Sequence, residues 1–77
     1  MSFIGKTEER KITTKGNTYK IFITQQTGGY WVATVLYSKV GTITAQNEVA
    51  STREDAYCKA ATFALNKIDE NATIEPL

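Results

Sequence analysis

Histidine is absent from this chain of 77 residues, and cysteine, proline and tryptophan each occur only once. Without histidine the sequence lacks the commonest general base and the commonest neutral metal ligand. The single cysteine, Cys58, excludes an internal disulfide and leaves too few soft ligands for a zinc site within one chain. Cys58 also has no histidine to activate it as a nucleophile. We therefore expect no metal, no cofactor and no enzymatic activity.

Long hydrophobic runs are also missing, so the sequence predicts neither a signal peptide nor a helix that spans a membrane. The net charge is only +1, which creates no overall field that would favour nucleic acid or an anionic lipid surface. The apolar content of 42% is that of an ordinary folded protein. The lone cysteine fits a reducing compartment. These features predict a single domain over residues 1–77, located in the cytoplasm and without a membrane partner.

Two β-strands and a tight turn are the clearest local features. Residues 19–24 alternate between two faces and are rich in residues that favour strands. Residues 30–37 are apolar at nearly every position, which is typical of a central strand covered on both faces. Between them lie Gly28 and Gly29, which can supply the positive φ angles that a tight hairpin needs. The sequence therefore predicts a β-hairpin here.

A further strand is expected over residues 42–46, and the pattern leaves open whether it extends to Val49. An antiparallel meander is thus expected over residues 10–50. Residues 10–15 are β-prone and precede a turn at Gly16, but the pattern leaves open whether they form a separate strand. The sheet is thus expected to have three or four strands. Residues 1–9 show no clear period and are interpreted as a lead-in segment.

One helix is predicted over about residues 52–70, followed by a short tail at residues 71–77. Ser51 and Glu54 have the spacing of a capping box, with Ser51 as the N-cap. An apolar stripe at helical spacing contains Ala56, Tyr57, Ala60, Ala61, Ala64, Leu65 and Ile68. Its alanines would let the helix backbone approach a sheet closely. The predicted fold class is therefore α+β, an antiparallel meander packed against one C-terminal helix.

One helix can cover only one face of the sheet, and the apolar central strand would leave its other face bare. The sequence does not show which face the helix takes. We expect a small non-catalytic interaction or regulatory module that binds a protein partner, or a second copy of itself, through the sheet face or edge. The residues predicted to bind this partner are Lys20, Phe22, Trp31, Val35, Tyr37 and Lys39.

The alternative is a nucleic-acid-binding protein. Aromatic side chains on a sheet with lysines between them can stack on single-stranded bases. The aromatic residues on the predicted strands are Tyr19, Phe22, Tyr30, Trp31 and Tyr37, and the flanking lysines are Lys15, Lys20 and Lys39.

The order of strand, Gly-Gly turn, two strands and an alanine-rich helix resembles the HicB-like antitoxin family, which has a degenerate RNase H-like domain. The similar stretches are Tyr19–Ile23, Gly28–Ala33 and Thr52–Ala56 with Ala60 and Ala64. They cover roughly residues 19–68. The resemblance implies a βββα domain and a role as an antitoxin.

Overall fold

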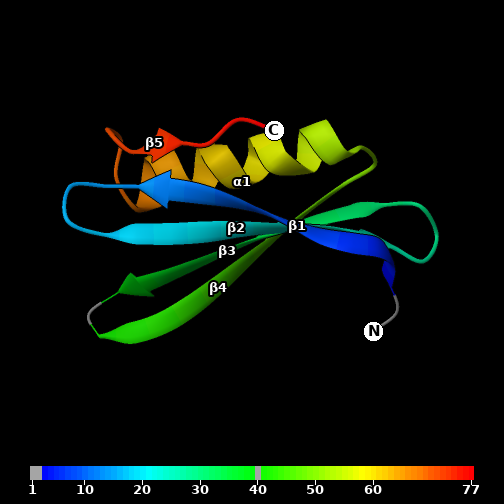
Figure 1. Ribbon diagram of the computed structural model, residues 1–77, viewed down its shortest axis with the longest axis horizontal. Helices are drawn as coiled ribbons and strands as arrows, with labels where there is room; N and C mark the ends of the chain where they lie inside the picture. The colour runs from blue at the N-terminus through cyan, green and yellow to red at the C-terminus, as the bar shows by residue number, and fades with distance from the viewer. Residues whose placement is uncertain (1–2, 40) are drawn as a thin grey trace.

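The computed structural model describes residues 3–39 and 41–77, with side-chain environments for residues 7–38 and 41–77. Its elements are β1 (Phe3–Thr13), β2 (Thr18–Gln26), β3 (Trp31–Lys39), β4 (Thr42–Ala50), α1 (Arg53–Lys67) and β5 (Thr73–Ile74). The strands form one sheet in the order β4-β3-β2-β1-β5 (Figure 1). The predicted class is confirmed: a four-strand antiparallel meander is followed by one C-terminal helix that packs on the sheet.

The first strand is longer than the sequence indicated. Residues 3–9, expected to be a lead-in segment, belong to β1, which also includes residues 10–13 and pairs with β2. This pairing depends on main-chain hydrogen bonds to β2, and the register shifts between Ile4 and Glu8. Such an irregular strand shows no steady apolar period in its sequence. Met1 and Ser2 of the predicted segment lie outside the described residues.

The Gly-Gly hairpin between β2 and β3 is confirmed. Gly28 and Gly29 have φ angles of 104° and 91°, values that favour glycine because they are costly for residues with a Cβ. The main-chain N–H of Gln26 donates to the carbonyl of Tyr30 at 2.8 Å. The turn thereby fixes the register in which Gln25 faces Trp31.

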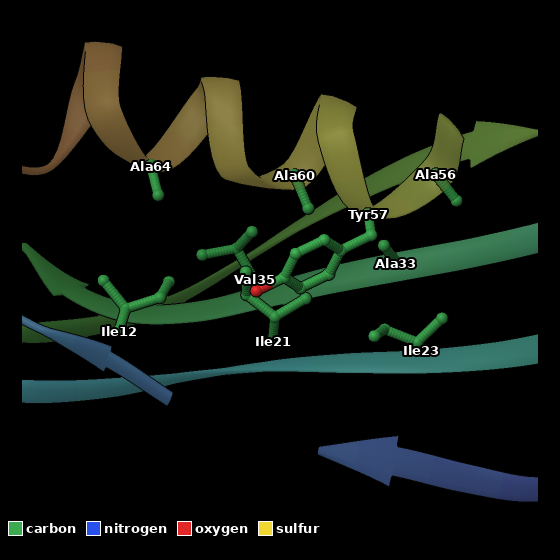
Figure 2. Packing of buried hydrophobic residues seen from close by; sticks show 9 residues of the cluster. All are labelled: Ile12, Ile21, Ile23, Ala33, Val35, Ala56, Tyr57, Ala60 and Ala64. Carbon is green, nitrogen blue, oxygen red and sulfur yellow. The ribbon is translucent and has the colours of Figure 1, made fainter. Parts of the chain in front are cut away.

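The helix covers the face of the sheet that carries Ala33 and Val35, which answers the question left open by the sequence. Figure 2 shows the helix alanines pointing at the sheet and the ring of Tyr57 lying between the two layers. The buried core consists of Ile12, Ile21, Ile23, Ala33, Val35, Ala56, Tyr57, Ala60 and Ala64. The apolar stripe of the helix is narrower than predicted, because Leu65 is exposed.

The helix begins one residue later than predicted. Thr52, not Ser51, is the N-cap, and its Oγ1 accepts a hydrogen bond of 3.1 Å from the main-chain N–H of Asp55. The neighbouring hydroxyl residues Ser51 and Thr52 are both good caps, so the sequence alone could not separate them. Glu54 lies beside Arg53, with 3.8 Å between Oε2 and Nη1, instead of reaching back to the cap. The helix ends at Lys67, before the predicted residue 70.

The predicted tail is part of the sheet. Thr73 and Ile74 form β5 and pair with the outer edge of β1. The main-chain N–H of Glu75 then donates to the Lys11 carbonyl at 2.9 Å, and the phenol of Tyr57 donates to the Glu75 carbonyl. A two-residue strand is too short to give a period in the sequence. The C-terminal segment therefore covers the end of this edge, along Lys11–Thr13.

Candidate interaction surface

One face of the sheet carries no covering layer among the described residues. Side chains alternate along each strand, so the neighbours of the buried core residues point to the side opposite α1. We call this side the open face. Its residues on the three strands farthest from β5 include Lys20, Phe22, Thr24, Val32, Thr34, Leu36, Ile43, Ala45, Asn47 and Val49. Ile43 and Val49 are 80% and 50% exposed, which is unusual for large aliphatic side chains.

The open face contains a hollow of about 320 Å³ between the Gly-Gly hairpin and β4. Its apolar lining includes Tyr30, Val32 and Val49. Its polar lining includes Thr34 and Asn47, which are joined by a hydrogen bond of 2.6 Å from Thr34 Oγ1 to Asn47 Oδ1. This bond uses the only donor of the Thr34 hydroxyl, while Tyr30, Val32 and Val49 provide the hollow with apolar surface for a partner.

The six residues predicted to bind a partner do not lie together. Lys20 and Phe22 are on the open face. The helix-covered face carries Trp31, Val35 and Tyr37, because these residues alternate with the open-face residues of β3. Val35 is 0% exposed and offers no surface to a partner, while Trp31 and Tyr37 pack against the core at its margin. The backbone of the sixth, Lys39, ends β3, but its side chain lies outside those described.

Residues of β4 were missing from the predicted surface. Ile43 and Val49 are the most exposed large aliphatic residues on the open face. The sequence signal for them was available: they are six residues apart, so they share one face of a strand. Only the order of strands in the sheet shows that this strand is also an edge.

The aromatic residues of the strands are divided between the two faces. Phe22 lies on the open face and Tyr30 lines its hollow, whereas the other three, Tyr19, Trp31 and Tyr37, pack at the margin of the core. The ring of Tyr37 stands 5.6 Å from that of Phe63, between centroids. A row of bases on the open face could therefore stack on two aromatic side chains instead of five.

The strongest ion pair joins β1 to the beginning of α1. Arg53 donates to both carboxylate oxygens of Glu8 at 2.6 Å, and Arg10 adds a bond of 3.3 Å. The hydrogen bond from Arg53 lowers the pKa of Glu8. All three side chains are partly buried on the helix side of the sheet. Because each charge has a partner, this cluster is explained as a structural clamp.

The edge of the sheet formed by β4 is unpaired within the described chain. In Figure 1 this strand rises from the lower left toward the beginning of the helix. Lys59 Nζ, on the helix, donates to the Val49 carbonyl at 2.9 Å. We infer from this bond that the Val49 carbonyl points to the unpaired side of β4 and not toward β3. Since main-chain groups alternate in direction along an antiparallel strand, those of Ile43, Ala45 and Asn47 point outward as well. We call these outward main-chain groups the free edge.

The remaining features of the surface carry little chemistry. Cys58 is exposed and borders a shallow depression of about 520 Å³ between the helix and β4. Across the residues that the structure describes, no group of three or more cysteine, aspartate and glutamate side chains is arranged to hold a metal ion. No helix in the same part of the chain combines the length and apolarity needed to cross a bilayer.

Comparisons of the chain with protein-family models, with curated proteins and with solved structures give no match. The resemblance to HicB-like antitoxins therefore remains a prediction.

Proposed function

We propose that this chain is a non-catalytic interaction module that binds a protein partner through its open face and the adjoining free edge. The observation that carries the proposal is the set of exposed aliphatic side chains on a face that no described element covers. Ile43 and Val49 stand at the rim of this face, and Val32 and Leu36 lie within it. Covering such side chains removes apolar area from water, which stabilises a complex.

The size of the domain supports the same proposal. A chain of 77 residues buries only about 60% of the surface of its unfolded state, so its own core is small. Four of the nine core residues are alanines, which contribute little apolar area each. Additional burial against a partner would therefore add substantially to the stability of this fold.

The experiment is affinity purification from the native host with two matched variants. Val32→Lys places a charge in the hollow of the open face, and Leu65→Lys places the same charge on the exposed side of the helix. We expect one defined protein to be retained by the wild type and by the helix variant and lost from the face variant. Circular dichroism spectra of both variants serve to check that they are folded. Equal retention by the three proteins would contradict the proposal.

The second candidate function is binding of nucleic acid. Lys11 and Lys20 are directly opposite each other on β1 and β2, with Phe22 on the same face. Like charges at such a pair repel, so a polyanion would relieve the repulsion. Glu9 competes for this role, because its carboxylate lies 3.6 Å from Lys20 Nζ. The test is binding of labelled oligonucleotides at several salt concentrations, by the wild type and by Lys20→Ala.

We also propose a location in the cytoplasm, supported by the exposed, unpaired thiol of Cys58. Fractionation of the native host tests this location directly. The antitoxin role implied by the resemblance is one form of the proposed protein binding. It would gain support if the protein retained by the open face were toxic when expressed alone.

A further inference from the structure

We propose that a second copy of this chain binds at the free edge. In this arrangement β4 of one copy pairs antiparallel with β4 of the other, and the two sheets become one. The inference rests on the proposed function, because it assigns a partner to part of the same surface. Two independent features of β4 support it: the direction of its main-chain groups and the symmetry of its side chains.

The main-chain groups of β4 are arranged for a further strand. The outward N–H and C=O groups belong to four alternate residues, Ile43, Ala45, Asn47 and Val49. Unpaired groups of this kind are a template for another strand. The bond from Lys59 does not close the template, because a carbonyl oxygen has two lone pairs and can accept a second hydrogen bond.

The side chains of β4 match those of a second copy in one register. Thr42–Ala50 has nine residues, so a twofold axis at Gln46 pairs every residue of the strand. In this register Ile43 faces Val49 of the second copy, and Val49 faces its Ile43. The two most exposed aliphatic side chains of the open face then cover each other on both sides of the axis.

Charge does not oppose this register. Glu48 is the only charged residue of β4, and it would face Thr44 of the second copy instead of the other Glu48. The strand itself contains neither lysine nor proline, the residues with which natural proteins commonly protect an exposed edge. Registers shifted by a single residue would place open-face side chains opposite those of the helix side, so they are excluded.

Pairing about a twofold axis limits the assembly at β4 to two copies, because each β4 edge is then covered by the other. At the opposite side of the sheet β5 pairs with Ile12 and Thr13 of β1, and the Arg10 side chain donates to the Pro76 carbonyl at 3.0 Å. Self-pairing of β4 therefore gives a closed dimer instead of a growing fibre. In that dimer the two open faces become continuous, and Ile43 of each copy borders the hollow of the other beside Val49.

The first test measures the solution mass by sedimentation equilibrium over a range of concentrations. The wild type should approach twice 8.5 kDa. Ala45→Pro should remain at 8.5 kDa, because proline removes an N–H that points to the free edge and no bond to β3. Ile43→Lys should raise the dimer Kd about tenfold or more while leaving the fold intact, since this side chain is already exposed. Leu65→Lys is the control and should leave the Kd unchanged.

The second test is a cross-link at the twofold axis. In a Cys58→Ser background, Gln46→Cys places one thiol in each copy at a pair without main-chain hydrogen bonds. There the Cα atoms are about 4.5 Å apart, which a disulfide can span. Mild oxidation should give a covalent dimer rapidly. Ala45→Cys, which faces Asn47 of the second copy, should cross-link far more slowly. A monomeric mass with no faster cross-linking at Gln46→Cys would overturn the proposal.

The outcomes separate this inference from the proposed function. A monomer that still retains a protein in a Val32-dependent manner would reject self-pairing and support binding through the open face. A dimer sensitive to Ala45→Pro that retains no other protein would support self-pairing and reject binding of a different protein partner.

Discussion

Glu8 links the first strand to the beginning of the helix through two short hydrogen bonds from Arg53. The residues are 45 positions apart in the sequence, so the contact exists only after the helix has packed on the sheet. Both side chains are about 30% exposed, and water therefore screens part of their attraction. The clamp contributes modestly to stability and makes that contribution dependent on pH.

Replacing Glu8 with Gln should lower the free energy of unfolding at neutral pH by about 1 kcal/mol. Folding lowers the pKa of Glu8 below its ordinary 4.5, chiefly through the Arg53 hydrogen bond. The contribution is therefore present above about pH 4.5 and disappears as the pH falls through the lower, folded-state pKa. Urea denaturation at a series of pH values measures the difference between the two proteins. A difference that grows on acidification would contradict this account.

The N-cap of the helix gives a second prediction at the scale of single residues. Thr52→Ala removes the oxygen that accepts from the Asp55 N–H and should destabilise the fold by about 1 kcal/mol. Ser51→Ala, the matched control, should change stability much less, because Ser51 is exposed and Thr52 holds the cap position. Thermal denaturation of both variants decides between the two hydroxyls. Equal losses would show that both residues act in the cap.

Among the elements, β5 is the shortest, with two residues. It pairs with Ile12 and Thr13 of β1, and the residue after it accepts the hydrogen bond of Tyr57. Burial of this phenol raises its pKa, so the group stays protonated and able to donate well into the alkaline range. The short strand thus connects the helix, the first strand and the C-terminal segment.

Deleting residues 71–77 should destabilise the fold and uncover the part of the β1 edge that β5 protects. We expect a lower unfolding temperature and concentration-dependent aggregation, because the longer unpaired edge of β1 could then pair with other copies. Tyr57→Phe is the control: it removes one hydrogen bond, costs about 1 kcal/mol and leaves the edge covered. Calorimetry and light scattering measure the two effects. A truncated protein as stable and as monodisperse as Tyr57→Phe would show that β5 is dispensable.

The elements that were predictable from the sequence are those with a strong local signal. The strand over residues 19–24, the Gly28-Gly29 turn and the alanine-rich helix each follow from periodicity or turn chemistry. The first residues of β1 and the whole of β5 have no such signal, since they are held by main-chain pairing with distant segments. Local sequence carries little information about pairing of that kind.

The candidate surface was only partly predictable for a related reason. Alternation along β3 separated its residues into two sets, but nothing local showed which set the helix would cover. Val35 was thus assigned to the surface although it is buried, whereas Val32 lies on the open face. The order of strands was needed to show that Ile43 and Val49 lie on an edge strand.

The whole molecule has two layers, a sheet and a single helix, with the helix on one side only (Figure 1). Among the described residues this asymmetry leaves one face of the sheet without a covering layer, and that face meets the unpaired edge of the sheet along β4. The interaction proposed for the face and the self-pairing proposed for the edge therefore use adjoining parts of one surface. Residues of β4 belong to both.

Hydrogen exchange of the β4 amides, followed residue by residue with NMR, tests the central claim most directly. The inward N–H groups, such as that of Gln46, should be protected by β3 in either case. If two copies pair, the outward N–H groups of Ile43, Ala45, Asn47 and Val49 should be protected as well, and Ala45→Pro should abolish protection at the other three. The account would be contradicted if, at high protein concentration, these outward amides exchanged at nearly the rate of an unfolded chain.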